Sequence, residues 1–171
     1  MSQTEGKPVR VHPSHVTGRV LAGDASIIEQ AIRLLGPIHM VDAMYLVPGL
    51  LGWTNGRAIF VANGQPPGSY LLTLVHEAAH LILHAQVLKA TPAHLHGHRN
   101  AHELEAEAVA CATMFALGYN FVRFSAAYLA GYSVNAEQLA RSLPAIHRAT
   151  KCILGLVRSV DRDGRAATGA A

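Results

Sequence analysis

The stretch Tyr70–His84, YLLTLVHEAAHLILH, decides what fold and chemistry to expect of this chain. On a helical wheel its apolar residues surround a narrow polar stripe, made of Thr73, His76, Glu77, His80 and His84. A helix that is apolar nearly all round is buried. A buried stripe of three histidines and a carboxylate is unfavourable unless those groups are paired or bind a metal. The stretch therefore predicts a buried helix that carries a polar site.

Within this stretch, His76 and His80 stand four residues apart, which places their side chains about 40° apart and one turn along a helix. Both imidazoles can therefore reach one metal ion. Glu77 lies at a neighbouring angle, where its carboxylate could contact a water on that metal without binding the metal. His84 repeats the four-residue step, but the stripe has rotated on by then, so a hydrogen bond to the site is expected of it. The motif is short and also occurs on solvated helices; the apolar flanks argue against a solvated face here.

A third ligand is expected from the segment HELEAEAVACATMFAL at residues 102–117, because a catalytic zinc site takes three protein ligands and leaves one position for water. Glu103 and Glu107 share one face of this expected helix, and Glu105 points roughly opposite. One of that pair could bind the metal while the other orients a ligand histidine. The alternative is that all three acids solvate a helix N-terminus, where they favour the helix dipole.

Length and composition indicate one globular domain. The chain has 171 residues, of which 50% are hydrophobic and 15% charged, which excludes a disordered chain. The net charge is +3 with Lys and Arg scattered, so the charge permits nucleic-acid contact without predicting it. Cys111 and Cys152 show no CxxC spacing, and the chain shows neither a secretory signal nor an apolar run long enough for a membrane span. A cytoplasmic protein without a membrane partner is expected.

The domain is expected over residues 21–160, between a flexible arm at residues 1–20 and a flexible tail at residues 161–171. The expected elements are a helix capped at Asp24 or Ser26 and ended by Gly36, short strands near 40–47 and 57–62, and helices near 70–89, 101–117, 125–131 and 135–160. Glu29 should complete a capping box with Ser26, and Pro144 should bend the last helix. The two strands are expected to form a hairpin or a small antiparallel sheet, because the segment between them is rich in turn residues. The predicted fold class is therefore α+β, mostly helical.

The order HEAAHLILH followed by ELEAEAVA resembles the ImmA/IrrE family of metallopeptidases, whose pattern is HExxHxxxH and then Glu-x-[Glu/Gln]-Ala-[Asn/Asp]. The segments ELEAEAVA, AAYLAGY and KCIL are closer to those of the C-terminal peptidase domain of ArdC-type antirestriction proteins. This resemblance covers roughly residues 55–155. It departs from the family at Glu107, where the family has Asn or Asp. The N-terminal single-strand DNA-binding domain of ArdC-type proteins is not expected in the residues ahead of the match.

The resemblance implies a zincin-like metallopeptidase domain in which His76, His80 and Glu103 bind Zn²⁺, Glu77 is the general base and Glu107 supports a ligand. It implies hydrolysis of a peptide bond in a protein or peptide substrate by metal-activated water, with a regulatory protein as the expected target. The alternative is a non-catalytic, metal-stabilised regulatory or DNA-contacting module of antirestriction type. A clustered basic face near the site would favour that alternative.

Three further sets of residues have both a chemical and a structural interpretation. Tyr128 could donate to the oxyanion of a hydrolytic intermediate, but a packing role is favoured. Trp53 and Tyr45 could line a substrate groove, but the core is favoured for isolated aromatic residues. A second metal site is a weaker interpretation than a solvated loop for the histidines His94, His96, His98 and His102.

Overall fold

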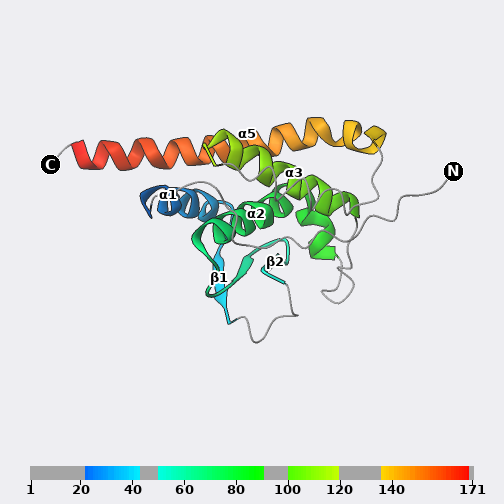
Figure 1. Cartoon of the computed structure of the whole chain (residues 1–171), viewed down its shortest axis with the longest axis horizontal. Coiled ribbons are helices and arrows are strands. Elements are labelled where there is room, and N and C mark those ends of the chain that lie inside the picture. Colours follow the sequence, from blue (N-terminus) through cyan, green and yellow to red (C-terminus); the bar gives the residue numbers. More distant parts are fainter. Residues whose placement is uncertain (1–21, 43–49, 91–99, 120–135, 170–171) are drawn as a thin grey trace.

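The computed structural model describes residues 22–42, 50–90, 100–119 and 136–169. Within these ranges the order of elements is α1, β1, β2, β3, α2, α3 and α5. The elements are layered around α2 (Pro67–Ala90): the sheet lies on one side of this helix, and α3 (Asn100–Ala116) lies on the other (Figure 1). The long helix α5 (Ala136–Gly169) packs across α1 (Ala22–Arg33) and α3. The expected helix over 125–131 lies outside the described residues.

The helix α1 begins earlier than its sequence signals indicated. Because the helix starts at Ala22, Ser26 lies inside it, and its hydroxyl accepts a hydrogen bond from Gln30 Nε2 at 2.9 Å instead of capping the helix. Glu29 is likewise engaged elsewhere: one carboxylate oxygen pairs with Arg33 Nη2 at 2.6 Å and the other accepts the Tyr70 hydroxyl at 2.9 Å. The expected capping box between Ser26 and Glu29 is therefore absent from this helix.

The sheet is mixed, which corrects the expected antiparallel arrangement. Its strands β1 (Ile38–Val41), β2 (Gly52–Thr54) and β3 (Ile59–Ala62) lie in the order β1-β3-β2. The strand β2 is antiparallel to β3, whereas β1 is parallel to it. Side-chain alternation along a strand has the same period whichever way its neighbour runs, so the sequence pattern could not give this order. The hairpin is formed by β3, which was expected as a strand over 57–62, and by β2, which lies in the segment that was expected to hold only turns.

The turn of this hairpin is fixed by local hydrogen bonds and by contact with α2. The side-chain oxygen of Asn55 accepts the backbone N–H groups of Arg57 and Ala58 at 3.0 and 2.9 Å. Gly56 has a φ of 79°, and a Cβ there would lie 2.6 Å from the carbonyl oxygen of Ala85 in α2. Glycine is therefore required at this position both by the backbone conformation and by the close approach of the helix.

The core forms where α2 meets its neighbours. By length and composition α2 would also be long and apolar enough to cross a membrane, but it is the central helix here and packs against α1, α3, β2 and β3. Ala106 and Ala110 of α3 are fully buried, and such small residues let two helices approach closely. The largest fully buried apolar side chains come from every helix and from β3, and are Ile28, Ile32, Ile59, Val61, Leu71, Leu74, Val75, Val109, Met114 and Ile153.

The helix α5 extends beyond the end expected near residue 160. Residues 161–169 were expected to belong to a flexible tail, but they continue the helix through Gly169. Val157 is buried and Val160 packs against the core, so the last core contacts lie within about one turn of the start of this extension. Arginine and alanine, which favour helix, follow without a proline that would stop it. Pro144 lies inside the helix.

We predict that Gly52→Ala destabilises the fold, because β2 lies almost in contact with α2 at this residue. An added Cβ would lie 2.7 Å from Thr73 Cγ2, 3.0 Å from the Phe60 carbonyl oxygen and 3.3 Å from Glu77 Cγ. Overpacking of this kind costs about 1–3 kcal/mol, and urea unfolding would measure it. Gly155→Ala is the matched control: nothing lies within 4 Å of a Cβ there, and alanine in a helix should raise stability by about 0.5–1 kcal/mol. Equal unfolding midpoints for the two variants would contradict this packing.

Candidate metal centre

The helices α2 and α3 bring two imidazoles and one carboxylate to a common point. His76 Nε2 and His80 Nε2 lie 3.1 Å apart. Of the two carboxylate oxygens of Glu103, Oε2 lies 3.3 Å from His76 Nε2 and Oε1 lies 3.5 Å from His80 Nε2. The ligand atoms of these three residues all lie within 4.8 Å of one another, so the group could hold a metal ion. For a tetrahedral ion with bonds of about 2.1 Å, neighbouring ligand atoms are about 3.4 Å apart, which agrees with these separations.

The hydrogen bonds on the far side of each imidazole decide which nitrogen carries the lone pair. His76 Nδ1 lies 3.2 Å from Glu107 Oε2, and a carboxylate can only accept, so this nitrogen is the donor. His84 Nε2 donates in the same way to Glu105 Oε2 at 2.8 Å, which leaves Nδ1 of a neutral His84 as an acceptor. His80 Nδ1, 3.0 Å away, therefore donates to it. The neutral rings of His76 and His80 thus both point the lone pair of Nε2 toward the same space.

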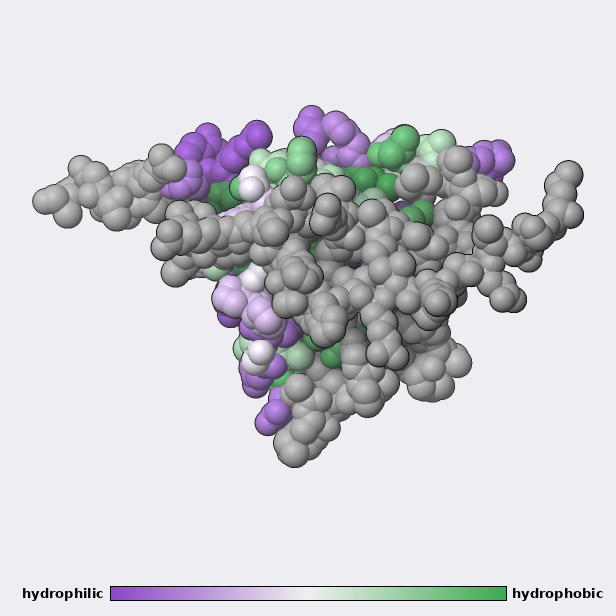
Figure 2. All heavy atoms as spheres, viewed as in Figure 1, coloured by the Kyte–Doolittle hydropathy of each residue, from purple (hydrophilic) through white to green (hydrophobic). Residues whose placement is uncertain are grey.

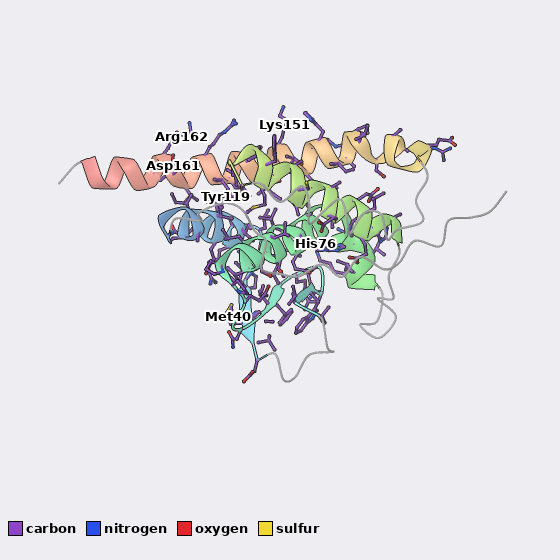
Figure 3. The ribbon with its side chains drawn as sticks, in the orientation of Figure 1. Met40, His76, Tyr119, Lys151, Asp161 and Arg162 are labelled. Atoms are coloured by element: carbon purple, nitrogen blue, oxygen red, sulfur yellow. The ribbon has the colours of Figure 1, made fainter. Side chains whose placement is uncertain are left out.

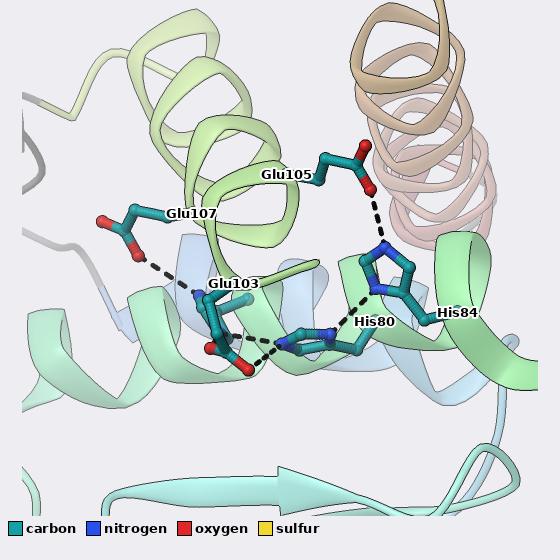
Figure 4. Close-up of polar contacts among 6 residues, drawn as sticks. His80, His84, Glu103, Glu105 and Glu107 are labelled. Atoms are coloured by element: carbon teal, nitrogen blue, oxygen red, sulfur yellow. Dashed lines mark hydrogen bonds and ion pairs between the residues drawn. The ribbon is translucent and has the colours of Figure 1, made fainter. Parts of the chain in front are cut away.

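These contacts form a continuous chain from the metal ligands to α5, and Figure 4 shows its links from His80 to Glu105. It runs from His80 to His84, from His84 to Glu105, and from Glu105 to the hydroxyl of Ser142, which donates to the other carboxylate oxygen. The His102 ring stacks on His84 with centroids 4.2 Å apart. Burial lowers the pKa of His84, although the carboxylate of Glu105 opposes this, and a neutral ring is the form this chain requires.

The roles of Glu105 and Ser142 were not predicted from the sequence. Glu105 was expected to point roughly opposite to Glu103 and Glu107, and it does leave that face, but its carboxylate reaches His84 at the end of the histidine stripe. Ser142 stands 37 residues further along the chain. The four-residue step from His80 to His84 was the signal for a hydrogen-bonded third histidine; no sequence spacing pointed to its two further partners.

The protonation states of His76 and Glu103 depend on each other. Burial would lower the pKa of His76, but hydrogen bonds to Glu103 and Glu107 outweigh it and raise that pKa to about 10. Burial would also raise the pKa of Glu103, but its hydrogen bonds to His76 and His80 outweigh that and hold its pKa far below the usual range. Without a metal, the space between the imidazoles is therefore best filled by a proton on His76, next to an ionised Glu103.

Glu77 lies beside this group without joining it. Its side chain is 6% exposed, and no ligand contact involves it among the described residues. Burial raises the pKa of Glu77 to about 7, with the nearby Glu103 adding to the increase and His76 opposing it. The strand β2 covers this side of α2, since Gly52 lies against Glu77 Cγ. A buried carboxyl group that titrates near neutrality is suited to proton transfer.

The other residues singled out from the sequence do not join this site. Tyr128, Tyr45, His94, His96 and His98 lie outside the described residues. Trp53 is part-buried and stacks on Phe60 with centroids 4.6 Å apart, and Phe60 stacks on His39 at 5.1 Å. Trp53 alternates with Gly52 and Thr54, which face α2, so it lies on the outer face of the sheet and in neither the core nor the site. The two cysteines are free.

Comparison with known families gives one match. The sequence profile of the peptidase M78 family, described as the IrrE N-terminal-like domain, matches residues 39–142. This range contains the sheet except for Ile38, the helices α2 and α3, and the first residues of α5. It therefore contains all the residues of the site from His76 to Ser142. No curated protein and no solved structure shows significant similarity to the chain.

We predict that the protein binds one divalent ion per chain and that Glu103 is required for it. Glu103→Ala removes the one carboxylate that, among the residues the structure describes, contacts both imidazoles, so metal content should fall to background. Glu105→Ala changes a carboxylate that contacts His84 and Ser142 and neither ligand imidazole; it should keep one ion but with an affinity about 10–100-fold lower, the usual effect of losing a group that orients a ligand. Elemental analysis and chelator competition would measure both. If Glu105→Ala loses the ion and Glu103→Ala keeps it, Glu103 is not the third ligand.

We also predict that metal binding releases about one proton at neutral pH. The raised pKa of His76, about 10, means that its imidazole is protonated in the metal-free protein at pH 7. A metal needs the neutral ring, so apparent metal affinity should increase by about tenfold per pH unit as the pH rises from 7 toward that pKa. Calorimetry in buffers of different ionisation enthalpy counts the released protons. An affinity that is flat between pH 7 and 8.5 would show that His76 is already neutral.

Proposed function

Because the chain belongs to the peptidase M78 family, through its IrrE N-terminal-like domain, we propose that it is a zinc-dependent metallopeptidase. The observation that carries this proposal is the convergence of two imidazole lone pairs and one carboxylate beside a buried glutamate that is not a ligand. Three protein ligands with one position left for water are typical of catalytic zinc sites. In this proposal His76, His80 and Glu103 hold Zn²⁺.

The reaction proposed is hydrolysis of a peptide bond. Bound zinc would supply a water of pKa about 7 and would polarise the substrate carbonyl. Glu77 takes the proton of the attacking water and later delivers it to the leaving amine, for which a carboxyl pKa near 7 is well matched. Glu107 holds His76, and His84 with Glu105 holds His80, in the tautomers that present Nε2 to the metal.

The position of β2 supports an extended peptide as the substrate. Among the described strands β2 is at the edge of the sheet, and its Gly52 lies against Glu77 Cγ. A peptide that adds to a sheet edge is held by backbone hydrogen bonds, with little dependence on its sequence. A substrate paired with β2 would therefore pass close to the general base. We propose that the substrate is a regulatory protein of the cytoplasm and that the ArdC-type peptidase domains are the relevant subgroup of the family.

The decisive experiment replaces the general base without touching a ligand. We predict that Glu77→Gln retains its metal and its fold but hydrolyses peptides about 10²–10⁴-fold more slowly, because loss of a general base typically has an effect of this size. His80→Ala should lose both the metal and the activity. New peptide N-termini, counted by mass spectrometry after incubation with peptides from a cell lysate, would measure hydrolysis.

The same pair of variants tests the non-catalytic alternative. If the protein's effect in cells survives Glu77→Gln and is abolished by His80→Ala, then the metal has a structural role and the chain is a metal-stabilised regulatory module. If both variants abolish the effect while Glu77→Gln still holds its metal, the peptidase proposal stands.

A further inference from the structure

The outward face of α5 carries a row of cations that the sequence, read along its length, did not reveal. Residues seven apart lie about 20° apart on an α-helix, and those three or four apart lie on neighbouring turns. By this geometry five cationic residues of α5 fall within a sector of about 100°. They are Arg141, Arg148, Lys151, Arg158 and Arg162. We call these five residues the basic row.

The basic row is held on the solvent side by the packing of the opposite face. Ile146, Ala149, Ile153 and Val157 are buried against α1 and α3, and their mean direction is about 180° from that of the basic row. All five cationic residues are exposed. In Figure 3 Lys151 and Arg162 point away from the rest of the molecule, and Figure 2 shows hydrophilic residues along this edge.

Few acidic groups neutralise the basic row. Arg141 forms an ion pair with Glu137 at the start of the helix. Within the part of the chain that the structure describes, no carboxylate lies within ion-pair distance of Arg148, Lys151 or Arg158. The acidic residues Asp161 and Asp163 lie on either side of the sector and not within it. The row therefore presents a strip of positive charge.

We propose that the basic row docks on the phosphate backbone of a double-stranded nucleic acid. The row extends from Arg141 to Arg162 on one helix, a separation of about 32 Å at 1.5 Å per residue. That length is close to one turn of a duplex, about 34 Å, and a duplex is stiff over far longer distances. A row of this length, laid along a duplex, therefore crosses each of the two helical phosphate backbones about once. This function goes beyond peptide hydrolysis and does not depend on it.

The chemistry of α5 favours a duplex over other anionic partners. Binding to single strands relies on aromatic side chains that stack on the bases, and α5 contains no aromatic residue. Binding to an anionic membrane relies on an apolar face beside the basic one, but the apolar face of α5 is packed into the core. Contacts made by the row alone would be to phosphates, so binding should be independent of base sequence.

The basic row and the metal centre lie on opposite sides of α5. Ser142, which hydrogen-bonds to Glu105, is on the side of the helix that faces α3. The basic row therefore does not lie at the metal site. The non-catalytic, DNA-contacting alternative would need a basic face there, so the row does not favour it. A duplex bound to the row would leave the metal centre open to a peptide.

The experiment removes three charges from the centre of the basic row. We predict that the metal-loaded protein binds a labelled DNA duplex of arbitrary sequence in fluorescence anisotropy. Arg148→Gln/Lys151→Gln/Arg158→Gln should bind about a hundredfold more weakly at ~0.05 M salt. The slope of log affinity against log salt should fall by about 3, since each lost phosphate contact removes about one unit. An RNA duplex, a single strand and anionic phospholipid vesicles are the comparison ligands, and the RNA duplex should behave as the DNA duplex does.

A matched control removes the same net charge elsewhere. Arg33→Gln/Arg57→Gln/Lys89→Gln replaces three exposed cations outside α5, and it should bind the duplex as the unchanged protein does. Glu77→Gln should also bind normally, which separates this proposal from the catalytic one. Equal weakening by the two triple variants would overturn the proposal, because the attraction would then be diffuse. Vesicle or single-strand binding stronger than duplex binding would overturn it too, as would the absence of duplex binding at low salt. Melting temperatures of both triple variants verify that they are folded.

Discussion

The structure depends on two imidazole nitrogens that point their lone pairs at each other across 3.1 Å inside a buried site. Each ring is held in this orientation from behind, His76 by Glu107 and His80 by His84. Two lone pairs at this distance repel unless a cation lies between or beside them. In the metal-free protein a proton on His76 meets that need, and its hydrogen bonds to Glu103 and Glu107 outweigh burial and raise the pKa of His76 to about 10. A metal ion held also by Glu103 would meet the same need, and such an exchange of proton for metal would link fold to chemistry.

The elements around α2 are arranged so that this orientation is rigid. The alanines of α3 let that helix approach closely enough for three glutamates to act in different directions: Glu103 toward the imidazoles, Glu107 toward the back of His76, and Glu105 toward His84. Ser142 of α5 holds Glu105 in turn. On the other side of α2, Gly52 lets β2 lie against Glu77. Two helices and a strand thus each fix one part of a site whose three histidines and Glu77 are all on α2.

The two opposite faces of the helix α5 have different roles. Its inner face contributes Ile153 and Val157 to the core and Ser142 to the hydrogen-bond chain that ends at the metal ligands. Its outer face carries the basic row. Because one rigid helix joins them, the row has a fixed orientation relative to the metal centre, although the two face away from each other. A peptidase proposed to act on a regulatory protein would gain from such a surface if its substrate is itself bound to nucleic acid.

The sequence by itself determined the buried helix of His76, the approach of His80 to the same point, and the helix that supplies Glu103, since four-residue spacing and apolar flanks are local properties of one helix. Only the tertiary structure decided the strand order, because alternation does not tell a parallel neighbour from an antiparallel one. It also decided which glutamate contacts which histidine, the part played by Ser142, and the helical continuation through Gly169. The cations of α5 are spread along the sequence; the helix brings them into one sector, and packing of the opposite face turns that sector toward solvent. Contacts between distant segments depend on how helices pack, and that is set by the whole core and not by the spacing within any one segment.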